Sequence, residues 1–340
     1  MIIEKLLGKL TMSSKSTVLD KLLSPEIYPH PTRDTITLIE TNVSLVLLTG
    51  DFAYKMKKPV KFGEVLDFST LEKRLEACKN EILFNKRLAP TLYLGVEYFS
   101  ENGEIGGKGR PIEYLVKMRQ LPQETLLVNI INETGKLDEK LILDLAKKIA
   151  SFHKKNIYHP EFSVFDAIYE KWDENFRTTH TYDGFPEDMS FEKRVYDFLS
   201  NNEQFWLNRG KNGRIVEGHG DLILRNIFYH KGELIIFDCI EFNKMLRIQD
   251  VLEEVSFLAM DLDYYGLSSL SDLFIKQYLA AVNESITYVD PIIQFYKTYR
   301  AFVRAKVFFS QSLHETEDAK REKQKELSLK YYELSKQYRF

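Results

Sequence analysis

The first third of the chain carries short runs of β-forming residues, each followed by turn residues. Three of these runs occupy residues 36–40, 44–48 and 52–56. The break before the third run contains Gly50-Asp51, a pair that suits a tight hairpin turn. The pattern therefore predicts an antiparallel meander of three strands.

A helical period replaces the strand pattern after this meander. Apolar side chains recur at helical spacing over residues 66–88, and Ser69 with Glu72 fits a capping box at the start. Two more strand-like runs follow at residues 92–99 and 113–118. The predicted order is three strands, one helix and two strands.

The chain divides into two regions with different patterns. Residues 1–121 contain the predicted sheet and its single main helix. Later residues favour helices: residues 138–155 are strongly periodic, the chain is helical again from Leu252, and the charged stretch from Glu315 predicts a solvated helix. We predict an α+β fold with a sheet-containing lobe and a mostly helical lobe over residues 122–340.

Composition and charge narrow the class of protein. The 340 residues are 44% hydrophobic and 13% aromatic, as in a globular protein rather than a disordered chain. The net charge of -3 gives no general attraction to nucleic acid or to an acidic membrane surface. Cys78 and Cys239 have no spacing typical of a zinc site or a disulfide framework. The polar N-terminus and the lack of a long apolar run favour a cytoplasmic protein.

One segment of the second region carries the residue types that phosphoryl transfer requires. Residues 219–226 read H-G-D-L-I-L-R-N, and a predicted strand at residues 233–237 then leads to Asp238. Transfer from a nucleotide needs a carboxylate that accepts the proton of the attacking hydroxyl, and oxygen ligands for Mg²⁺. Asp221 can supply the first, and Asn226 and Asp238 can supply the second.

This pattern, H-G-D-x-x-x-x-N followed by a strand and Asp, resembles the Brenner-type loop of aminoglycoside phosphotransferases and their small-molecule kinase relatives. The chain is also similar to an uncharacterised aminoglycoside-phosphotransferase-like family, some of whose members are fused to a P-loop ATP-binding module. The matching stretches are residues 49–55, 66–74, 88–96 and 237–242. No G-x-x-x-x-G-K-[ST] motif occurs in this sequence. The resemblance runs from about residue 35 to about residue 310 and implies a bilobal protein-kinase-like fold.

The resemblance implies roles for charged residues of the first region. The sequence F-A-Y-K that ends at Lys55 resembles the V-A-I-K of a kinase third strand, which implies that Lys55 binds the nucleotide α/β-phosphates. Lys57 has the same strand parity and is the rival candidate. Glu81 is the best candidate for the acid that orients the lysine, with Glu72 and Glu76 as rivals. Since parity does not separate the two lysines, distance to Glu81 is the criterion: we expect the Lys55 ammonium to lie nearer to the Glu81 carboxylate than the Lys57 ammonium does, and a nearer Lys57 would transfer the role.

Two further segments of the first region fit or depart from the resemblance. The segment around Arg119 and Leu121 falls where the hinge of such enzymes lies, which implies that their backbone groups face the adenine edge. No Gly-rich loop covers the phosphates. The turn at residues 41–44, with its hydroxyls and amides, is the candidate to serve instead.

Several residues near the H-G-D segment have less direct roles. Ile223 stands where related kinases have Lys or His, which removes a contact to the γ-phosphate, and Arg225 is a candidate to replace it. We expect His153 and Asp250 to be structural. Glu241 either approaches the metal or pairs with Arg247.

The sequence therefore predicts an ATP- or GTP-dependent, Mg²⁺-dependent O-phosphotransferase that acts on a hydroxyl of a small molecule. Residues 160–210 and the C-terminal helices are expected to form the acceptor pocket. A nucleotide-binding pseudokinase or scaffold is one alternative, because of Ile223 and the missing Gly-rich loop. A protein kinase is another, although no A-P-E segment follows Asp238.

Overall fold

The computed structural model describes residues 18–340, which form two compact units. The first unit extends to Gln123 and also includes His230–Asn243. The second consists of Glu124–Tyr229 and Lys244–Phe340. The chain therefore passes between the units at three points, and the segment that contains Asp238 belongs to the first unit.

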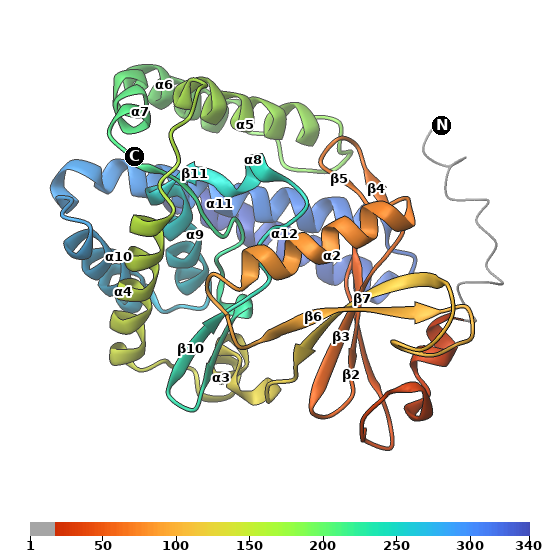
Figure 1. The fold of residues 1–340 in the computed structure, drawn as a ribbon. Coiled ribbons are helices and arrows are strands. Elements are labelled where there is room, and N and C mark those ends of the chain that lie inside the picture. The colour runs from red at the N-terminus through yellow and green to blue at the C-terminus, as the bar shows by residue number, and fades with distance from the viewer. Residues whose placement is uncertain (1–17) are drawn as a thin grey trace. The chain divides into compact units, whose positions relative to one another are not determined.

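The first unit contains a five-stranded antiparallel sheet in the order β1-β2-β3-β7-β6 (Figure 1). The predicted meander is confirmed, because β1, β2 and β3 are sequential neighbours. The later strand β7 pairs with β3, so β3 becomes the central strand. The bounds are β1 Thr37–Glu40, β2 Ser44–Leu48, β3 Phe52–Lys57, β6 Tyr93–Ser100 and β7 Pro111–Arg119.

The main helix of this unit, α2, covers Leu71–Asn85 and is shorter than the sequence predicted. Leu66 lies in the short strand β5 (Leu66–Asp67), which pairs with β4 (Lys61–Phe62). The expected cap at Ser69 is wrong, because Asp67 accepts hydrogen bonds from both the backbone and the hydroxyl of Ser69. The hydroxyl of Thr70 caps the helix by accepting from the Lys73 N–H at 3.3 Å.

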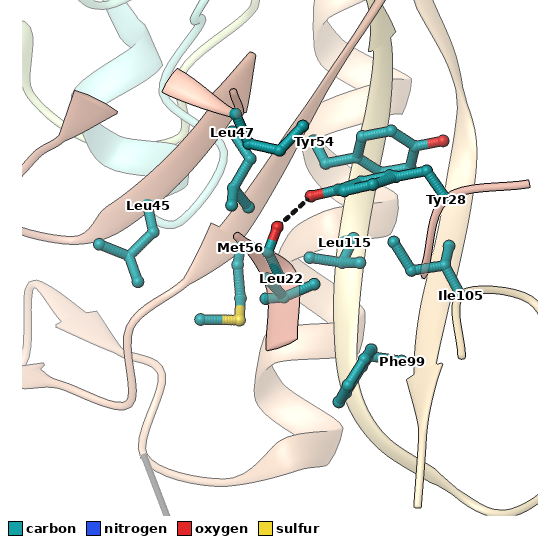
Figure 2. Close-up of a cluster of buried hydrophobic side chains, with 10 residues drawn as sticks. Leu22, Tyr28, Leu45, Leu47, Tyr54, Met56, Phe99, Ile105 and Leu115 are labelled. Carbon is teal, nitrogen blue, oxygen red and sulfur yellow. Dashed lines mark hydrogen bonds between the residues drawn. The ribbon is translucent and has the colours of Figure 1, made fainter. Parts of the chain in front are cut away.

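The two faces of β3 have different surroundings: one packs into the apolar core and the other carries the charged side chains. Tyr54 and Met56 point into a core with Leu47 and Leu115, which also receives Leu22 from the preceding segment (Figure 2). Successive side chains of a strand point to opposite faces. The residues between them, including Lys55, therefore point to the other face of the sheet.

The second unit is mostly helical, as predicted, and its core is rich in aromatic side chains. Trp172 is fully buried and packs against rings from two other helices, among them Phe302 and Phe191. The helices are α3 Leu127–Thr134, α4 Glu139–Lys155, α5 Val164–Thr179, α6 Met189–Asn201, α7 Glu203–Lys211, α8 Lys244–Arg247, α9 Val251–Tyr264, α10 Ser268–Ala281, α11 Ile286–His314 and α12 Asp318–Gln337. Its strands are β8 Ile215–Glu217, β9 Ile227–His230 and β11 Ile248–Asp250, while β10 (Glu233–Ile236) lies in the first unit. Short 3-10 turns lie at Pro25–Ile27, Gln123–Thr125 and Leu224–Asn226.

The last helix, α12, is less solvated than its charge suggested. Its exposed face carries ion pairs at helical spacing, such as Lys330 with Glu326 at 2.8 Å. The opposite face buries Tyr331 and Tyr332, and α12 packs along α11 (Figure 1). Across residues 18–340, no helix has the length and apolar character needed to span a membrane.

Candidate functional site

Two lysines on the central strand share one buried carboxylate. The Lys55 Nζ lies 2.9 Å from Oε1 of Glu81, and the Lys57 Nζ lies 2.5 Å from its Oε2. The strand alternation points both lysines to the same face, where α2 presents Glu81, a fully buried side chain. Glu81, rather than Glu72 or Glu76, is therefore the acid of α2 that contacts the lysines.

The expected order of the two distances is wrong. Lys57 is nearer to Glu81 than Lys55 is. The carboxylate has two oxygens and sits between two side chains of equal strand parity, so it binds both. By the distance criterion the phosphate role moves to Lys57, and only the other partners and the burial of the two lysines argue for Lys55.

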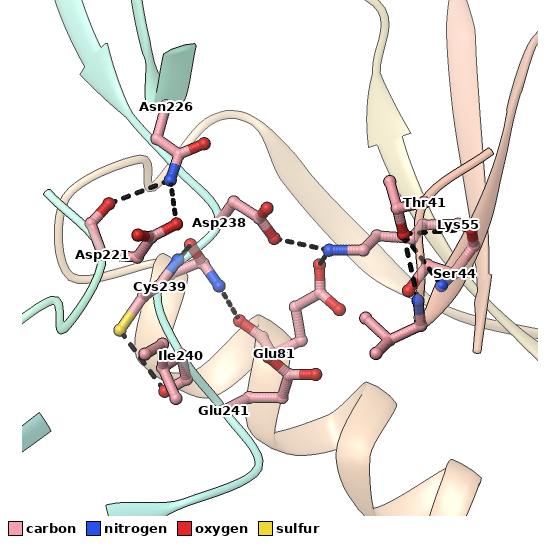
Figure 3. A network of polar contacts seen from close by, with 12 residues as sticks. Thr41, Ser44, Lys55, Glu81, Asp221, Asn226, Asp238, Cys239, Ile240 and Glu241 are labelled. Carbon is pink, nitrogen blue, oxygen red and sulfur yellow. Dashed lines mark hydrogen bonds and ion pairs between the residues drawn. The ribbon is translucent and has the colours of Figure 1, made fainter. Parts of the chain in front are cut away.

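Each lysine has a second acidic partner in the segment that returns to this unit. Lys55 lies 2.5 Å from Oδ1 of Asp238 (Figure 3). Lys57 forms an ion pair with Glu241. The Lys57 side chain is 1% exposed, whereas those of Lys55 and Asp238 are 11% and 42% exposed. The Lys55–Asp238 pair is therefore the accessible end of the cluster, and the Lys57–Glu241 pair is its buried end.

The backbone around Asp238 is held in an uncommon conformation. Asp238 has a φ of 63°, in the left-handed region that few residues other than glycine adopt. Its N–H donates to the Tyr93 hydroxyl at 3.2 Å, and the Cys239 N–H donates to Oδ1 of Asn85 at 2.8 Å. Asn85 in turn donates to the Glu81 carbonyl at 2.8 Å. The segment is thus tied to the same helix that carries the shared carboxylate (Figure 3).

The charges of this cluster support one another. Burial alone lowers the pKa of Lys55, but Asp238 and Glu81 raise it well above its usual value. Burial raises the pKa of Glu81, yet Lys55 and Lys57 bring it below the ordinary value. For Glu241, burial outweighs Lys57 and leaves its pKa raised. Lys55 therefore stays positively charged. An anion that binds to it must displace the carboxylate of Asp238.

In the predicted hinge around Arg119 and in the turn at residues 41–44, some backbone N–H groups already donate hydrogen bonds to other groups of the protein. The Arg119 N–H donates to the Leu92 carbonyl at 2.9 Å, so only other backbone groups near Leu121 are available to a base. In the turn between β1 and β2, the Thr41 hydroxyl accepts from the Ser44 N–H at 2.9 Å and from the Val43 N–H at 3.4 Å (Figure 3). The turn thus satisfies the amides that were candidates to cradle phosphate.

In the second unit, the residues of the H-G-D segment form a closed loop around Asp221. The Asn226 side-chain amide donates to the Asp221 carbonyl and to its Oδ2, both at 2.9 Å (Figure 3). Its nitrogen is turned to Asp221, so the Asn226 oxygen is the atom suited to a metal ion. Arg225 Nη2 lies 3.6 Å from Oδ2 of Asp221. Ile223 is buried and takes no part in this polar arrangement.

A buried carboxylate on α9, Glu254, holds the start of this loop. It accepts hydrogen bonds from the N–H groups of His219 and of Gly220, the latter at 3.0 Å. His153 Nε2 lies 2.7 Å from its other oxygen, which confirms a structural position for His153. Gly218 is required here, because a Cβ would stand 1.9 Å from Oε2 of Glu254.

A second carboxylate of α9, Asp261, holds the middle of the loop by accepting from the Leu224 N–H at 2.8 Å. Asp250 is structural, as predicted: it pairs with Arg209 and caps α9 through the Leu252 N–H. Sequence reasoning missed Glu254 and Asp261. Their signal was two carboxylates seven residues apart, on one face of a helix that is rich in apolar residues.

Within residues 18–340, no cluster of three or more His, Cys, Asp or Glu side chains has the geometry of a metal site. The predicted Mg²⁺ ligands are one amide and one carboxylate, a smaller set that this observation does not address. Both cysteines are buried free thiols.

Comparison with known proteins identifies the fold. No protein-family model matches the chain. Uncharacterised proteins of Mycobacterium bovis and Mycobacterium tuberculosis are 36% identical over 288 residues, which is 82% of this chain and 56% of theirs. The chain thus spans about half the length of the curated relatives it matches.

Solved structures of small-molecule kinases share the whole architecture. A choline/ethanolamine kinase family protein from Mesorhizobium loti has a TM-score of 0.54 at 10% identity, covering 94% of this chain and 99% of its own. A choline kinase from Cryptosporidium parvum has 0.54 at 12%, covering 94% and 96%. A GDP complex of an aminoglycoside 2'-phosphotransferase has 0.53 at 15%, covering 95% and 97%. The chain therefore has the protein-kinase-like fold of small-molecule kinases, which confirms the predicted fold class and the resemblance to aminoglycoside phosphotransferases.

The buried carboxylate of Glu254 generates a prediction about stability and pH. Burial raises the pKa of Glu254, but the hydrogen bond and charge of His153 and the loop N–H groups lower it from 4.5 to about 2. A carboxylate whose pKa is lower in the folded protein stabilises the fold above pH 4.5 and loses this effect as the pH falls toward 2. We expect Glu254→Gln to lose about 3 kcal/mol of unfolding free energy at pH 7, and clearly less at pH 3.

Urea unfolding at both pH values measures this difference. Glu187→Gln removes an exposed carboxylate from the loop before α6 and should leave the unfolding free energy nearly unchanged at either pH. A loss for Glu254→Gln that is the same at pH 3 and pH 7 would show that its charge does not stabilise the fold.

Proposed function

We propose that this protein is a nucleotide- and Mg²⁺-dependent phosphotransferase that phosphorylates a hydroxyl group of a small molecule. The observation that carries the proposal is the Lys55–Glu81 ion pair on the central strand, with Asp238 as the second partner of Lys55. The names of the kinases with the same fold, which include choline kinase and aminopropanol kinase, support a small-molecule acceptor. ATP and GTP are both candidate donors.

Lys55 is the proposed ligand of the nucleotide α/β-phosphates. Lys57 is nearer to Glu81, but it is almost completely buried between Glu81 and Glu241 and has no face to offer a phosphate. Lys55 is also buried, but it is less so than Lys57, and its partner Asp238 has a side chain that is 42% exposed. A phosphate oxygen that takes the place of Asp238 would preserve the ion pairing of Lys55 and release the Asp238 carboxylate.

Asp238 and Asn226 are the proposed Mg²⁺ ligands. A carboxylate and an amide oxygen are hard donors that suit this ion, which also keeps several waters. Mg²⁺ bound to a nucleotide neutralises charge that develops on the phosphate oxygens during transfer. The backbone at Arg119 and Leu121 is the proposed contact for the base of the nucleotide, with the Arg119 N–H already committed to Leu92.

Asp221 is the proposed catalytic base. It would accept the proton of the acceptor hydroxyl, whose oxygen then bonds to the γ-phosphorus while the bond from that phosphorus to the leaving diphosphate breaks. Asn226 holds the Asp221 side chain, and Glu254 and Asp261 hold the loop backbone. This support fixes the carboxylate in one orientation before substrate binds, which is the main requirement of a loose transition state.

The alternative is a nucleotide-binding protein that does not transfer phosphate. It is favoured by the burial of Ile223 and by the turn at residues 41–44, whose amides are satisfied internally. A protein kinase is a weaker alternative, because only eleven residues separate Asp238 from Asp250 and no A-P-E segment is present. Phosphoryl transfer to a small molecule distinguishes the proposal from both.

The first prediction tests Asp221. Asp221→Asn keeps the shape of the side chain but removes its negative charge, so phosphoryl transfer should fall by about 10²–10⁴-fold while nucleotide affinity stays nearly unchanged. Transfer of labelled phosphate from ATP or GTP to a panel of hydroxyl compounds, beside a nucleotide titration, measures both. Asp183→Asn, an exposed residue before α6, is the matched control. Parental turnover in Asp221→Asn would exclude Asp221 as the base, and nucleotide binding without transfer to any acceptor would favour the alternative.

The second prediction separates the two lysines. Lys55→Met should raise the Kd for Mg-nucleotide by about 10–100-fold, because a charged contact to phosphate is lost. Lys57→Met should mainly lower the unfolding free energy, by about 3–5 kcal/mol, because it leaves buried carboxylates without their cation. Calorimetric titration and urea unfolding of both variants test this assignment. If the nucleotide affinity falls with Lys57→Met alone, the phosphate role belongs to Lys57.

The third prediction concerns Asp238 and the metal ion. Asp238→Ala removes the anion that pairs with Lys55, so metal-free nucleotide should bind at least as tightly as in the parent. The gain in affinity that Mg²⁺ produces should shrink by about tenfold, because one ligand is gone. Titrations of parent and variant with and without Mg²⁺ measure the two effects. Equal affinities under all four conditions would refute the metal assignment.

A further inference from the structure

An arginine on α11 lies against aromatic rings without a carboxylate bound to it. The Arg304 guanidinium is 4.7 Å from the ring centre of Phe308 and 5.4 Å from that of Tyr331. Its Nε is buried and has no hydrogen-bond partner within residues 18–340. A buried donor of this kind normally has an acceptor. The Nε–H of Arg304 can therefore still donate a hydrogen bond.

The rings hold this arginine in place. Phe308 stacks on Tyr331 at 5.6 Å, and Tyr331 stacks on Tyr264 at 4.2 Å, with interplanar angles of 14° and 7°. The column joins α11, α12 and the end of α9, which pack together in the second unit. A guanidinium is weakly hydrated and stacks well on aromatic faces, so this setting orients a cation that remains charged.

The arginine lies close to the proposed catalytic loop. Asp261, which accepts from the Leu224 N–H, has Arg304 and Arg225 as its cationic neighbours and Asp221 as an acidic one. Tyr265 also lies within electrostatic reach of both arginines. Arg225 is half exposed, with its Nη2 3.6 Å from the Asp221 carboxylate. The two guanidinium groups therefore lie on the same side of the unit as the proposed base.

Two arginines, Arg304 and Arg225, and two carboxylates, Asp221 and Asp261, lie within electrostatic reach of one another here. Burial raises the pKa of Asp261 to about 6, while the hydrogen bond from the Leu224 N–H and the charges of Arg304 and Arg225 oppose the rise. The other charged side chains near Tyr264 are Lys330 and Glu326, which pair with each other at 2.8 Å. The carboxylate of Asp221 already has Arg225 beside it, whereas the Nε of Arg304 has no hydrogen-bond acceptor within residues 18–340, which is the feature that an anionic group would satisfy.

We propose that Arg304, with Arg225 as a second cation, binds a phosphate or carboxylate group of the acceptor whose hydroxyl is phosphorylated. This inference rests on the proposed kinase function and names the class of its substrate: a hydroxyl compound that already carries a negative charge. The reaction is unchanged, since the hydroxyl oxygen bonds to the γ-phosphorus, the diphosphate leaves and Asp221 takes the proton. The anion of the acceptor takes no part in bond making and only positions it.

Matched compounds test the inference. Glycerol 3-phosphate, glycerate, glycerol and choline all carry a hydroxyl, and they differ in charge. We expect saturable binding of glycerol 3-phosphate or glycerate to the intact chain, measured by calorimetry with and without a non-hydrolysable Mg-nucleotide, and weaker binding of glycerol and choline. Stronger binding of glycerol 3-phosphate than of glycerate assigns the site to phosphate, and the reverse assigns it to carboxylate.

Variants tie the binding to the arginine. Arg304→Gln should raise the Kd for the anionic compound by about 10–100-fold, and Arg304→Lys, which keeps the charge, should raise it less. Arg177→Gln removes an exposed arginine of α5 and should have no effect. If Arg304→Gln unfolds, Arg225→Gln on the loop should still weaken anion binding several-fold.

The result can be separated from the proposed function itself. Binding is measured without turnover, and nucleotide affinity is measured in the same variants, where it should not change for Arg304→Gln. Three outcomes would overturn the inference: tighter binding of choline or glycerol than of the anions, no saturable binding of either anion, or an unchanged Kd in both arginine variants. If the protein phosphorylates choline or glycerol, the inference about an anionic acceptor is wrong but the proposed kinase function still holds.

Discussion

The carboxylate of Glu81 is ionised in a place from which water is excluded, and the arrangement of the first unit depends on it. An isolated buried charge is very costly, so Glu81 requires cations, and the strand β3 supplies two on one face. Those cations in turn require more than one carboxylate, which brings Asp238 and Glu241 to the same helix. One buried charge thus links a strand, a helix and a segment far away in sequence.

The second unit also relies on buried carboxylates, but there they bind backbone N–H groups instead of lysines. Glu254 and Asp261 project from one face of α9 and accept hydrogen bonds from backbone N–H groups of the loop around Asp221. Backbone donors are numerous and cannot move independently of the chain, so two carboxylates suffice to shape eight residues. The glycine at position 218 follows from this contact, because any side chain there would occupy the space of the Glu254 carboxylate.

These two arrangements explain why the proposed phosphoryl transfer would need few further residues. Phosphoryl transfer depends mainly on the positions and charges of the groups around the phosphate. In both units, buried carboxylates hold the proposed functional side chains in place. The groups proposed to meet substrates, Lys55, Asp238 and Asp221, are all at least partly accessible. Arg304 differs from these groups, since aromatic rings pack against its guanidinium and its acidic neighbour Asp261 lies only within electrostatic reach.

The local elements could be predicted from sequence because they depend on spacing along the chain. Alternation of side chains predicted the three-strand meander, and helical spacing predicted α4 within a residue. The H-G-D segment and the strand before Asp238 predicted the class of chemistry, because the residue types in this order match those of kinases. Spacing was less informative at the start of α2, where Asp67 competes for the amide and hydroxyl of Ser69 and the helix begins later.

Contacts between distant segments could not be predicted, because they depend on which side chains the packing brings together. Strand parity showed that Lys55 and Lys57 share a face, but only the packing of α2 decided that Glu81 lies between them and nearer to Lys57. The roles of Glu254 and Asp261 depend on where α9 meets the loop, about thirty to forty residues away in sequence. The sequence by itself determined the strands, the helices and the chemical groups available. The tertiary structure decided which charges are buried together, because desolvation and ion pairing depend on distance in space rather than on order along the chain.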